Sequence, residues 1–222
     1  MIGIYDSGKG GMSIIQEVLK MRPWFSYLYC ADTEILPLGN KSDIEIQERV
    51  VDGLEYLFDQ GCNLGILACN TASVQTIRFL QNEYLPQYHP DKNVLGVTTP
   101  LLEYTVQYEY LKSVPGLILA TPATCRTQFY QQELKRQGFL VTALPLPELA
   151  QAIEYHDQKT IQHCIYHSIV PYDPQWVILA CTHYTYVAHA IQSALPKTQI
   201  IDPTQYTALR VLWYLDHHPE YY

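Results

Sequence analysis

The 222-residue chain has no hydrophobic stretch long enough to cross a membrane and no run of lysines and arginines. Its formal net charge is −8, from 14 Lys and Arg against 22 Asp and Glu. A chain this acidic is a poor partner for nucleic acid or for an anionic membrane. The initial methionine leads directly into a strand-like segment, so we expect no signal peptide and a cytoplasmic protein.

The chain also lacks paired cysteines, because none of its six cysteines forms a C-x-x-C motif. This absence argues against a zinc ribbon and against a thioredoxin-type motif. His163 and His167 have the i, i+4 spacing of metal ligands on a helix, but no third ligand stands at an obvious spacing. We therefore predict a solvent-exposed helix face there and no metal site.

Short apolar runs alternate with longer segments of helical periodicity along the whole chain. Strand-like runs occupy residues 2–5, 26–30, 65–69, 94–98, 116–120, 139–144, 176–181 and 198–201. Their apolar residues are continuous, which is typical of parallel strands covered by helices on both faces. The alternation predicts an α/β fold built from parallel βαβ units.

Two of the intervening segments carry clear helix signals. Residues 11–22 place their apolar side chains in one stripe at helical spacing. Residues 42–61 begin with Ser42 and Glu45 spaced as a capping box and end at Gly61, which favours a helix stop. Both segments are therefore predicted to be helices between strands.

The organisation of the chain indicates two domains without a flexible linker, since no Gly- or Ser-rich segment is present. The strand–helix count restarts near residues 98–100, and we expect residues 204–218 to form a helix that packs back onto the first half. The predicted first domain comprises 1–98 plus 205–222, and the second comprises 99–204. We expect two similar parallel-sheet domains in pseudo-symmetric arrangement, with the active site in the cleft between them.

Two similar motifs, LACNTAS (67–73) and LACTHYT (179–185), end predicted strands with a cysteine. Ligands bind at the carboxyl ends of parallel strands, where Cys69 and Cys181 are expected to lie. A thiol at a helix N-terminus meets the positive end of the helix dipole, so we expect lowered pKa values for these cysteines. Buried structural thiols remain the simpler interpretation for Cys30, Cys62 and Cys164, and Cys125 is left open.

Two facing thiols suit one type of reaction. Inverting a stereocentre by proton exchange requires a base on one face of the carbon and an acid on the other. If both groups are cysteines, one is thiolate and the other thiol, and they exchange roles at each turnover. The sequence offers no lysine motif for pyridoxal phosphate, so we expect no cofactor.

Two further polar loops follow predicted strands. The segment DSGKGG (6–11) fails as a phosphate-binding loop, since Gly10 follows Lys9 where Ser or Thr is required. Asp6 suits an ammonium group, and a turn with Asp6 capping the next helix is the alternative. Backbone N–H groups of residues 37–39 could hold a carboxylate, but a structural turn is the favoured interpretation of that loop by itself.

The segments IGIYDSGKGG, ADTEILPLGNKS, ILACNTAS, ATPATCRTQFY and ILACTHYT, in this order, resemble the glutamate racemases of the aspartate/glutamate racemase superfamily. The matches extend from residue 2 to about residue 204. The resemblance implies two α/β domains and cofactor-independent interconversion of L- and D-glutamate, with D-glutamate supplying peptidoglycan. The implied partner is a small acidic amino acid, and a homodimer is left open.

The resemblance also implies roles for individual residues. Cys69 and Cys181 match the two acid/base cysteines, and Asp6 and His183 match the polar residues that assist them. Substrate-binding positions are matched by Asp6, Ser7, Pro37, Leu38, Gly39, Asn70, Thr71, Thr124, Thr182 and His183. Glu154 is expected to be the carboxylate that assists Cys181, with Glu148 as the alternative, and an exposed helix carboxylate is the competing interpretation of Glu154.

Several positions depart from the family pattern. Leu38 stands where a tyrosine is usual, Lys9 where a small or apolar residue is common, and Thr185 where proline usually follows the tyrosine. The sequence ends at Tyr222, so we expect the shortening to lie at the carboxyl end and the first domain to lack its final elements.

Three alternatives stay open. The first is a racemase of aspartate or another acidic amino acid, which Leu38 would permit. The second is a one-cysteine decarboxylase or isomerase, against which the presence of both Cys69 and Cys181 argues. The third is a shortened, non-catalytic binding relative.

Overall fold

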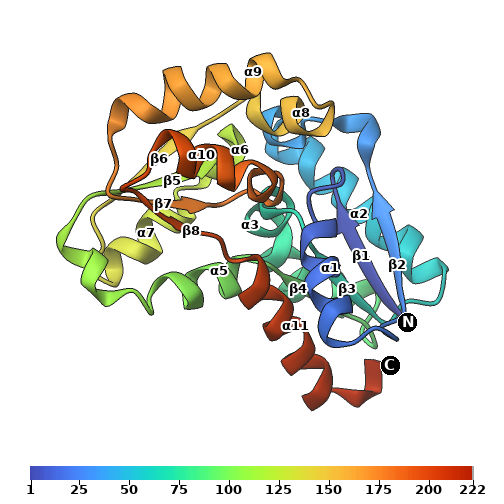
Figure 1. Cartoon of the computed structure of the whole chain (residues 1–222). Helices are drawn as coiled ribbons and strands as arrows, with labels where there is room; N and C mark the ends of the chain where they lie inside the picture. The colour runs from blue at the N-terminus through green and yellow to red at the C-terminus, as the bar shows by residue number, and fades with distance from the viewer. Residues whose placement is uncertain (222) are drawn as a thin grey trace.

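The computed structural model describes residues 1–221, which form two four-stranded parallel sheets (Figure 1). The strands are β1 (Ile2–Asp6), β2 (Tyr27–Ala31), β3 (Leu64–Leu67), β4 (Asn93–Gly96), β5 (Gly116–Ala120), β6 (Val141–Pro145), β7 (Trp176–Leu179) and β8 (Gln199–Ile201). The strand orders are β2-β1-β3-β4 and β6-β5-β7-β8, so each sheet has the second, first, third and fourth strands of its half in that sequence. The predicted fold class is confirmed, and we call the two sheets with their helices the first and second halves.

Helices connect the strands and cover both sheets. They are α1 (Met12–Met21), α2 (Asp43–Asp59), α3 (Asn70–Phe79), α4 (Leu85–Tyr88), α5 (Thr98–Thr105), α6 (Pro122–Thr127), α7 (Phe129–Arg136), α8 (Leu149–Glu154), α9 (Gln158–His163), α10 (Ala188–Ala194) and α11 (Thr204–His217). π-Helical turns at Leu80–Tyr84 and Cys164–Ile169 extend α3 and α9. Short 3₁₀ helices include η2 (Leu38–Asn40) and η7 (Thr182–Val187), which both adjoin the site described below.

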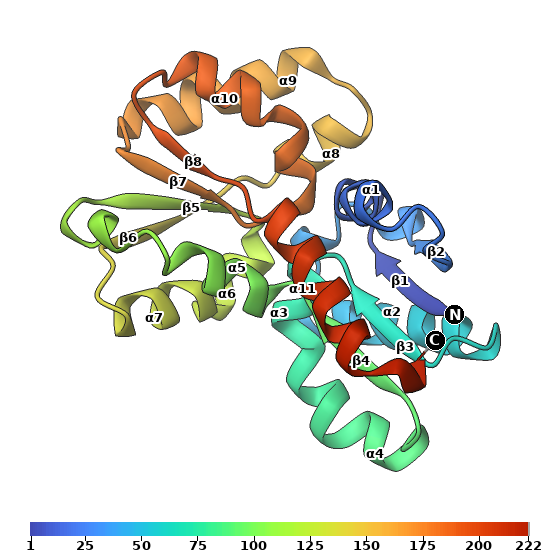
Figure 2. The same ribbon diagram turned by 60° about the horizontal axis from the view of Figure 1, so that its bottom comes forward.

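The central strands are buried along their whole length, which explains their continuous apolar sequences. One face of the first sheet packs against α1 and α11, and the other packs against α2 and α3 (Figure 2). The second sheet packs against α8, α9 and α10 on one face and against α5 and α7 on the other. Each half therefore has a hydrophobic core on both sides of its sheet.

All eight predicted strands are present, but the two that carry the cysteine motifs, like the strand predicted at 94–98, end two residues earlier than expected. The predicted strands 65–69 and 176–181 end at Leu67 and Leu179. The peptide N–H of Ala68 still bonds Tyr5 O at 2.8 Å, and that of Ala180 bonds Leu119 O at 2.9 Å. The cysteines that follow have left the sheet because each precedes the first residue of a helix.

The predicted helix signals are confirmed for α2. Ser42 and Glu45 form a reciprocal capping box at its N-terminus. Gly61, with a φ of +86°, follows its end in the left-handed conformation that glycine adopts without strain.

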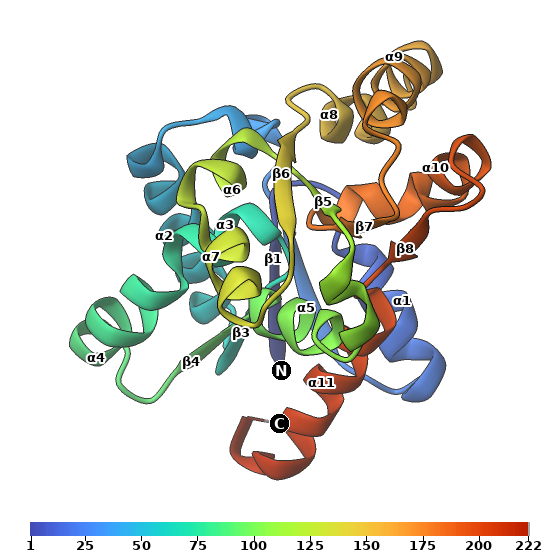
Figure 3. The ribbon, with the colours of Figure 1, turned by 90° about the vertical axis from the view of Figure 1, so that its left-hand side faces the viewer.

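The chain crosses between the halves at α5 and α11. Helix α5 leads from β4 to β5, and α11 returns from β8 to pack against α1, as predicted, and against α5. Near the other edge of the interface, α6 of the second half lies against α3 of the first (Figure 3). The domain boundaries at residues 98 and 204 remain a prediction. Within residues 1–221, none of the helices combines the length and the hydropathy of a membrane span.

Candidate active site

Cys69 and Cys181 occupy equivalent positions at the carboxyl ends of β3 and β7, the third strands of their sheets. Both are buried, and both line one small cavity between the halves. The cavity is lined by Ser7, Leu36, Pro37, Leu38, Gly39, Asn40, Cys69, Thr71, Thr121, Pro147, Ala150, Cys181 and His183. The equivalent topology of the halves therefore brings two thiols from distant parts of the chain to one space.

Cys69 lies beside Ser7, with 3.4 Å between its Sγ and the serine Oγ. Burial raises the pKa of the Cys69 thiol to about 12, and the negative charge of Asp6 acts in the same direction. Hydrogen bonds from Ser7 and from the backbone N–H of Ala72 favour the thiolate but are outweighed. The expectation that a helix N-terminus lowers this pKa is wrong, because desolvation exceeds the dipole effect at a buried sulfur.

Cys181 stands at one end of a chain of polar contacts. Its Sγ lies 4.0 Å from Nδ1 of His183, and Nε2 of His183 lies 2.8 Å from Oε2 of Glu154. The helix that follows Cys181 is the 3₁₀ helix η7, whereas Cys69 precedes an α-helix. The two motifs are thus similar in sequence but not identical in local structure.

Glu154 is 6% exposed, so its interpretation as an exposed helix carboxylate is wrong. Glu148, the alternative, is exposed at the start of α8. The hydrogen bond from His183 lowers the pKa of Glu154 despite its burial. Burial acts to lower the pKa of His183, but hydrogen bonds to Cys181 and Glu154 outweigh it and raise that pKa to about 10. His183 is consequently a cation at neutral pH, paired with an anionic Glu154.

Asp6, at the end of β1, is fully buried and only partly satisfied. Its Oδ2 accepts hydrogen bonds from the backbone N–H of Gly11 and from the Tyr29 hydroxyl, the latter at 3.1 Å. Among the described residues, Oδ1 of Asp6 is the only fully enclosed side-chain oxygen or nitrogen without a hydrogen-bond partner. Burial raises the pKa of Asp6, while the charge of His183 opposes the rise. A free, buried carboxylate oxygen is suited to a cationic ligand.

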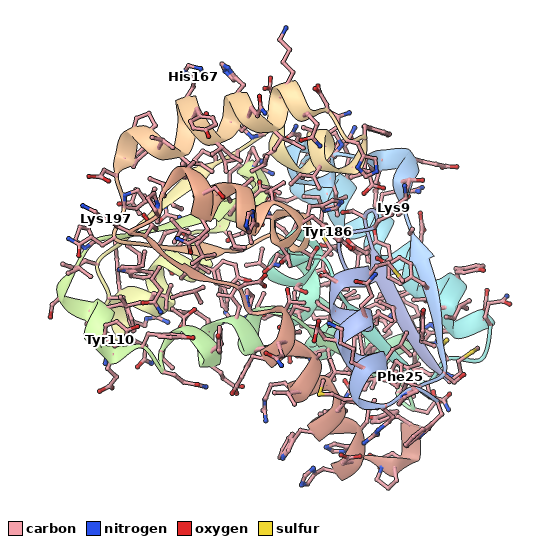
Figure 4. All side chains as sticks on the ribbon, viewed as in Figure 1. Lys9, Phe25, Tyr110, His167, Tyr186 and Lys197 are labelled. Atoms are coloured by element: carbon pink, nitrogen blue, oxygen red, sulfur yellow. The ribbon has the colours of Figure 1, made fainter. Side chains whose placement is uncertain are left out.

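The loop from Ser7 to Gly11 connects the two halves through Lys9 and Gly10. The backbone N–H of Lys9 donates to Oε2 of Glu154 at 3.1 Å, and its Nζ lies 3.6 Å from Oε1. The Tyr186 hydroxyl donates to the Lys9 carbonyl at 3.2 Å, and Figure 4 shows both side chains between the halves. A Cβ at Gly10 would lie 2.6 Å from Oγ1 of Thr182, so only glycine permits this approach.

Three threonine hydroxyls meet where the halves join beside the cavity. Oγ1 of Thr71 lies 2.9 Å from Oγ1 of Thr121 and 3.3 Å from that of Thr124, and Thr121 donates to Thr124 at 3.1 Å. Thr71 is the second residue of helix α3, whereas the other two belong to the N-terminus of α6. Hydroxyls and helix N-termini together favour an anionic group.

The loop 36–40 forms one wall of the cavity. Pro37, Leu38 and Gly39 line it, and Asn40 reaches across to the second half, where its Nδ2 donates to Pro147 O at 3.1 Å. The volume open to the centre of a water-sized sphere is about 20 Å³. This space admits about one water molecule. An amino acid can enter only if the halves or this loop move apart.

The remaining predicted residues stand directly behind the cavity wall. Asp6, Asn70, Thr124, Glu154 and Thr182 are all buried, but none of them lines the cavity itself. His163 and His167, set aside from the sequence, are exposed on the outer side of the second half, where Figure 4 labels His167. Residues 1–221 contain no group of three or more His, Cys, Asp or Glu that could hold a metal ion.

Sequence reasoning missed Thr121, Tyr29 and Tyr130. Thr121 directly follows β5, so the rule that ligands bind at strand carboxyl ends could have identified it. Tyr29 lies within β2 and Tyr130 within α7, and both act through hydrogen bonds to residues far away in the sequence. No local pattern marks such contacts.

Comparison with known sequences gives a consistent result, although no protein-family model matches the chain. A glutamate racemase from Phenylobacterium zucineum is 34% identical over 245 aligned positions, covering 99% of this chain and 87% of that protein. One from Ruegeria pomeroyi is 32% identical, covering 98% and 86%. The first alignment is longer than the chain, so part of the length difference lies in internal gaps. This corrects the expectation that the whole shortening lies at the carboxyl end.

Solved structures agree with the sequence comparison. A glutamate racemase isoform from Bacillus anthracis superposes with a TM-score of 0.84 at 25% identity, covering 98% of this chain and 82% of that one. A glutamate racemase from Thermus thermophilus in complex with β-chloro-D-alanine gives 0.79 at 26% identity, covering 98% and 81%. An aspartate racemase from Picrophilus torridus, at 17% identity and a TM-score of 0.65, shares the fold. The sequence relatives, the fold and the cavity between two cysteines agree: the chain belongs to the glutamate racemase family of amino-acid racemases.

Proposed function

We propose that the protein interconverts L- and D-glutamate without pyridoxal phosphate, by proton transfer between the substrate α-carbon and the thiols of Cys69 and Cys181. One observation carries this proposal: two thiols from equivalent strand ends of opposite halves line the same cavity. Inversion needs an acid and a base on opposite faces of one carbon. The pseudo-symmetric halves supply this pair with like groups.

The surroundings of the two cysteines differ, and in our proposal this difference assigns their roles. Nδ1 of His183 lies 4.0 Å from the Cys181 sulfur, where a cationic imidazole would stabilise the thiolate that the reaction requires. Cys69, with a pKa of about 12, retains its proton. In the proposed step the Cys181 thiolate takes the α-proton, and Cys69 delivers its own proton to the opposite face. The products are the inverted amino acid, a Cys181 thiol and a Cys69 thiolate, ready for the reverse reaction.

The groups around the cavity can hold an amino acid at both ends. In our proposal the site opens enough for the free Oδ1 of Asp6, which lies behind the cavity wall, to accept a hydrogen bond from the substrate ammonium. The hydroxyls around Thr71, with Asn70, Ser7 and Thr182, bind its carboxylates. The backbone of residues 37–39 completes the site. Hydrogen-bond donors on the α-carboxylate would stabilise the negative charge that develops there in the carbanion-like transition state, which is the usual function of preorganised donors.

We further propose that the enzyme works in the cytoplasm and supplies D-glutamate for peptidoglycan, as its family membership suggests. The chain would act as two domains, the first formed by residues 1–98 plus 205–222 and the second by residues 99–204. The crossing of the chain at α5 and α11 supports this division.

The decisive test is hydrogen exchange from solvent at the α-carbon. The protein would be incubated in deuterium oxide with L- or D-glutamate, and separately with L- or D-aspartate, because Leu38 lines the cavity where the family usually has tyrosine. Cys69→Ser and Cys181→Ser variants would be compared with Cys30→Ser, whose cysteine does not line the cavity. We expect deuterium to enter glutamate with inversion, and either active-site substitution to abolish the inversion.

If deuterium enters aspartate but not glutamate, the proposed mechanism would stand and the substrate would be aspartate. Inversion that survives the loss of one cysteine would overturn the two-base mechanism. Absence of exchange with all four amino acids, from a folded protein, would overturn the proposed activity.

A further inference from the structure

Asn70 joins the two halves directly beside Cys69. It is the first residue of α3, and its Oδ1 accepts a hydrogen bond of 2.5 Å from the hydroxyl of Tyr130. Tyr130 lies on α7 of the second half and is 1% exposed. No step of the proposed mechanism uses this tyrosine.

The bond selects one orientation of the Asn70 amide. Among residues 1–221, Oδ1 of Asn70 is the only hydrogen-bond partner of the Tyr130 hydroxyl. If the amide turned over, its NH₂ group would face that hydroxyl, and the buried phenolic proton would lose its acceptor. A buried donor without a partner is costly, so the observed orientation is favoured. Burial also raises the pKa of Tyr130, so the hydroxyl keeps the proton that it donates.

The selected orientation leaves the NH₂ group of Asn70 available. No described residue accepts a hydrogen bond from its Nδ2, and this atom is not among those fully enclosed, since Asp6 Oδ1 is the only enclosed side-chain atom without a partner. Its chain neighbours Cys69 and Thr71 both line the cavity. Two free N–H donors at this position are suited to a carboxylate.

We propose that Tyr130 is a positioning residue, which holds the Asn70 amide with its NH₂ group available to a substrate carboxylate. The inference rests on the proposed function, because it takes the ligand to be an amino acid bound beside Cys69. Tyr130 and Asn70 come from different halves, so the amide is oriented only while the halves are together. Closure of the cleft and preparation of this donor are thereby coupled.

A double-mutant cycle tests the inference. Tyr130→Phe, Asn70→Ala and the double variant would be compared with the native protein in KM and kcat for both glutamate enantiomers and in Tm. We expect Tyr130→Phe to raise KM by about tenfold, with a smaller change in kcat, because a hydrogen bond to a charged group weakens. In the Asn70→Ala background the same substitution should cause no further rise.

A second variant gives a readout that does not depend on Tyr130→Phe folding. Asn70→Asp retains an oxygen for the Tyr130 hydroxyl but directs a second oxygen, in place of NH₂, at the substrate carboxylate. We expect its KM to exceed that of Asn70→Ala. The matched control is Tyr84→Phe, which loses a tyrosine hydrogen bond of 2.6 Å to Glu55 away from the cavity and should leave KM unchanged.

If the increases in KM of the two single variants multiply in the double variant, the inference is overturned, because Tyr130 would then act independently of Asn70. An unchanged KM in Tyr130→Phe, or a KM of Asn70→Asp at or below that of Asn70→Ala, would overturn it too. These results, obtained with an active native protein, leave the proposed function intact. A native protein that is inactive on glutamate and aspartate would overturn both.

Discussion

Cys69 and Cys181 occupy equivalent positions but have different neighbours. Cys69 has a serine hydroxyl and a buried, partly unsatisfied aspartate nearby, whereas Cys181 has an imidazolium held by a glutamate. Equivalent backbone positions therefore have different chemical surroundings, with a basic side chain beside one thiol and an acidic side chain near the other.

Glu154→Gln should weaken the Cys181 side of the site. The substitution preserves the shape of the side chain but removes the charge that stabilises the His183 imidazolium, so the raised pKa of about 10 should fall. We expect kcat/KM to decrease by about one to two orders of magnitude, as for the loss of a hydrogen bond to a charged group. The decrease must be equal in both directions, because the two enantiomers have the same free energy. Initial rates from L- and D-glutamate measure it.

The same variant should change the pH dependence of stability. In the native protein the raised His183 pKa contributes stability that is complete below pH 6.5 and is lost as pH rises towards 10. The free energy of unfolding should thus fall over this range, with a smaller slope in Glu154→Gln. Urea titrations at several pH values measure this free energy. If it falls with pH at the same slope in the native protein and in Glu154→Gln, the assigned role of the glutamate is contradicted.

At the scale of secondary-structure elements, the carboxyl ends of parallel strands explain where the polar side chains gather. Asp6 ends β1, and Cys69, Thr121 and Cys181 each stand one or two residues beyond β3, β5 and β7. The strand ends were predictable because continuous apolar runs give way abruptly to polar residues. The type of helix after Cys181 was not predictable, because 3₁₀ and α turns have similar sequence patterns.

Gly61→Ala should test the predicted end of α2. The φ of +86° places the residue in the left-handed region, and a Cβ there would meet no atom within 4 Å, so the effect is backbone strain alone. We expect the free energy of unfolding to fall by about 1–2 kcal/mol without loss of kcat/KM. Urea denaturation and a rate assay measure the two quantities.

Gly61→Asn is the comparison for Gly61→Ala. Asparagine adopts the left-handed conformation more readily than alanine, so the free energy of unfolding should fall by less. Equal losses for Ala and Asn would indicate that strain at φ is not the cause.

At the scale of the whole molecule, the structure shows the halves in close contact. Contacts between the halves include Asn40 with Pro147, Thr71 with Thr121, and Arg126 with Lys41 O at 2.7 Å. The cavity leaves only about 20 Å³ open to the centre of a water-sized sphere, which is room for about one water molecule and not for glutamate. Substrate exchange therefore requires the contacts between the halves to break and to form again around the ligand.

Gly39→Ala should interfere with this closure. A Cβ on Gly39 would collide with the Cβ of Thr121, which belongs to the opposite half. The loop 36–40 or the whole half must then shift, and overpacking of this kind costs about 1–3 kcal/mol. We expect KM for glutamate to rise by about tenfold or more.

Gly61→Ala is the control for this prediction, because it should destabilise the fold without changing KM. A normal KM for Gly39→Ala would show that the loop 36–40 adapts without affecting closure.

The sequence by itself determined the alternation of strands and helices, the end of α2 and the location of both cysteines at strand ends. These features depend on periodicity, capping and turn residues, which act between near neighbours in the chain. Only the tertiary structure decided that Cys69 has a raised pKa, that Glu154 rather than Glu148 contacts His183, and that Tyr130 orients Asn70. Desolvation and contacts between the halves govern these properties, and both arise from packing between residues that are far apart in the sequence.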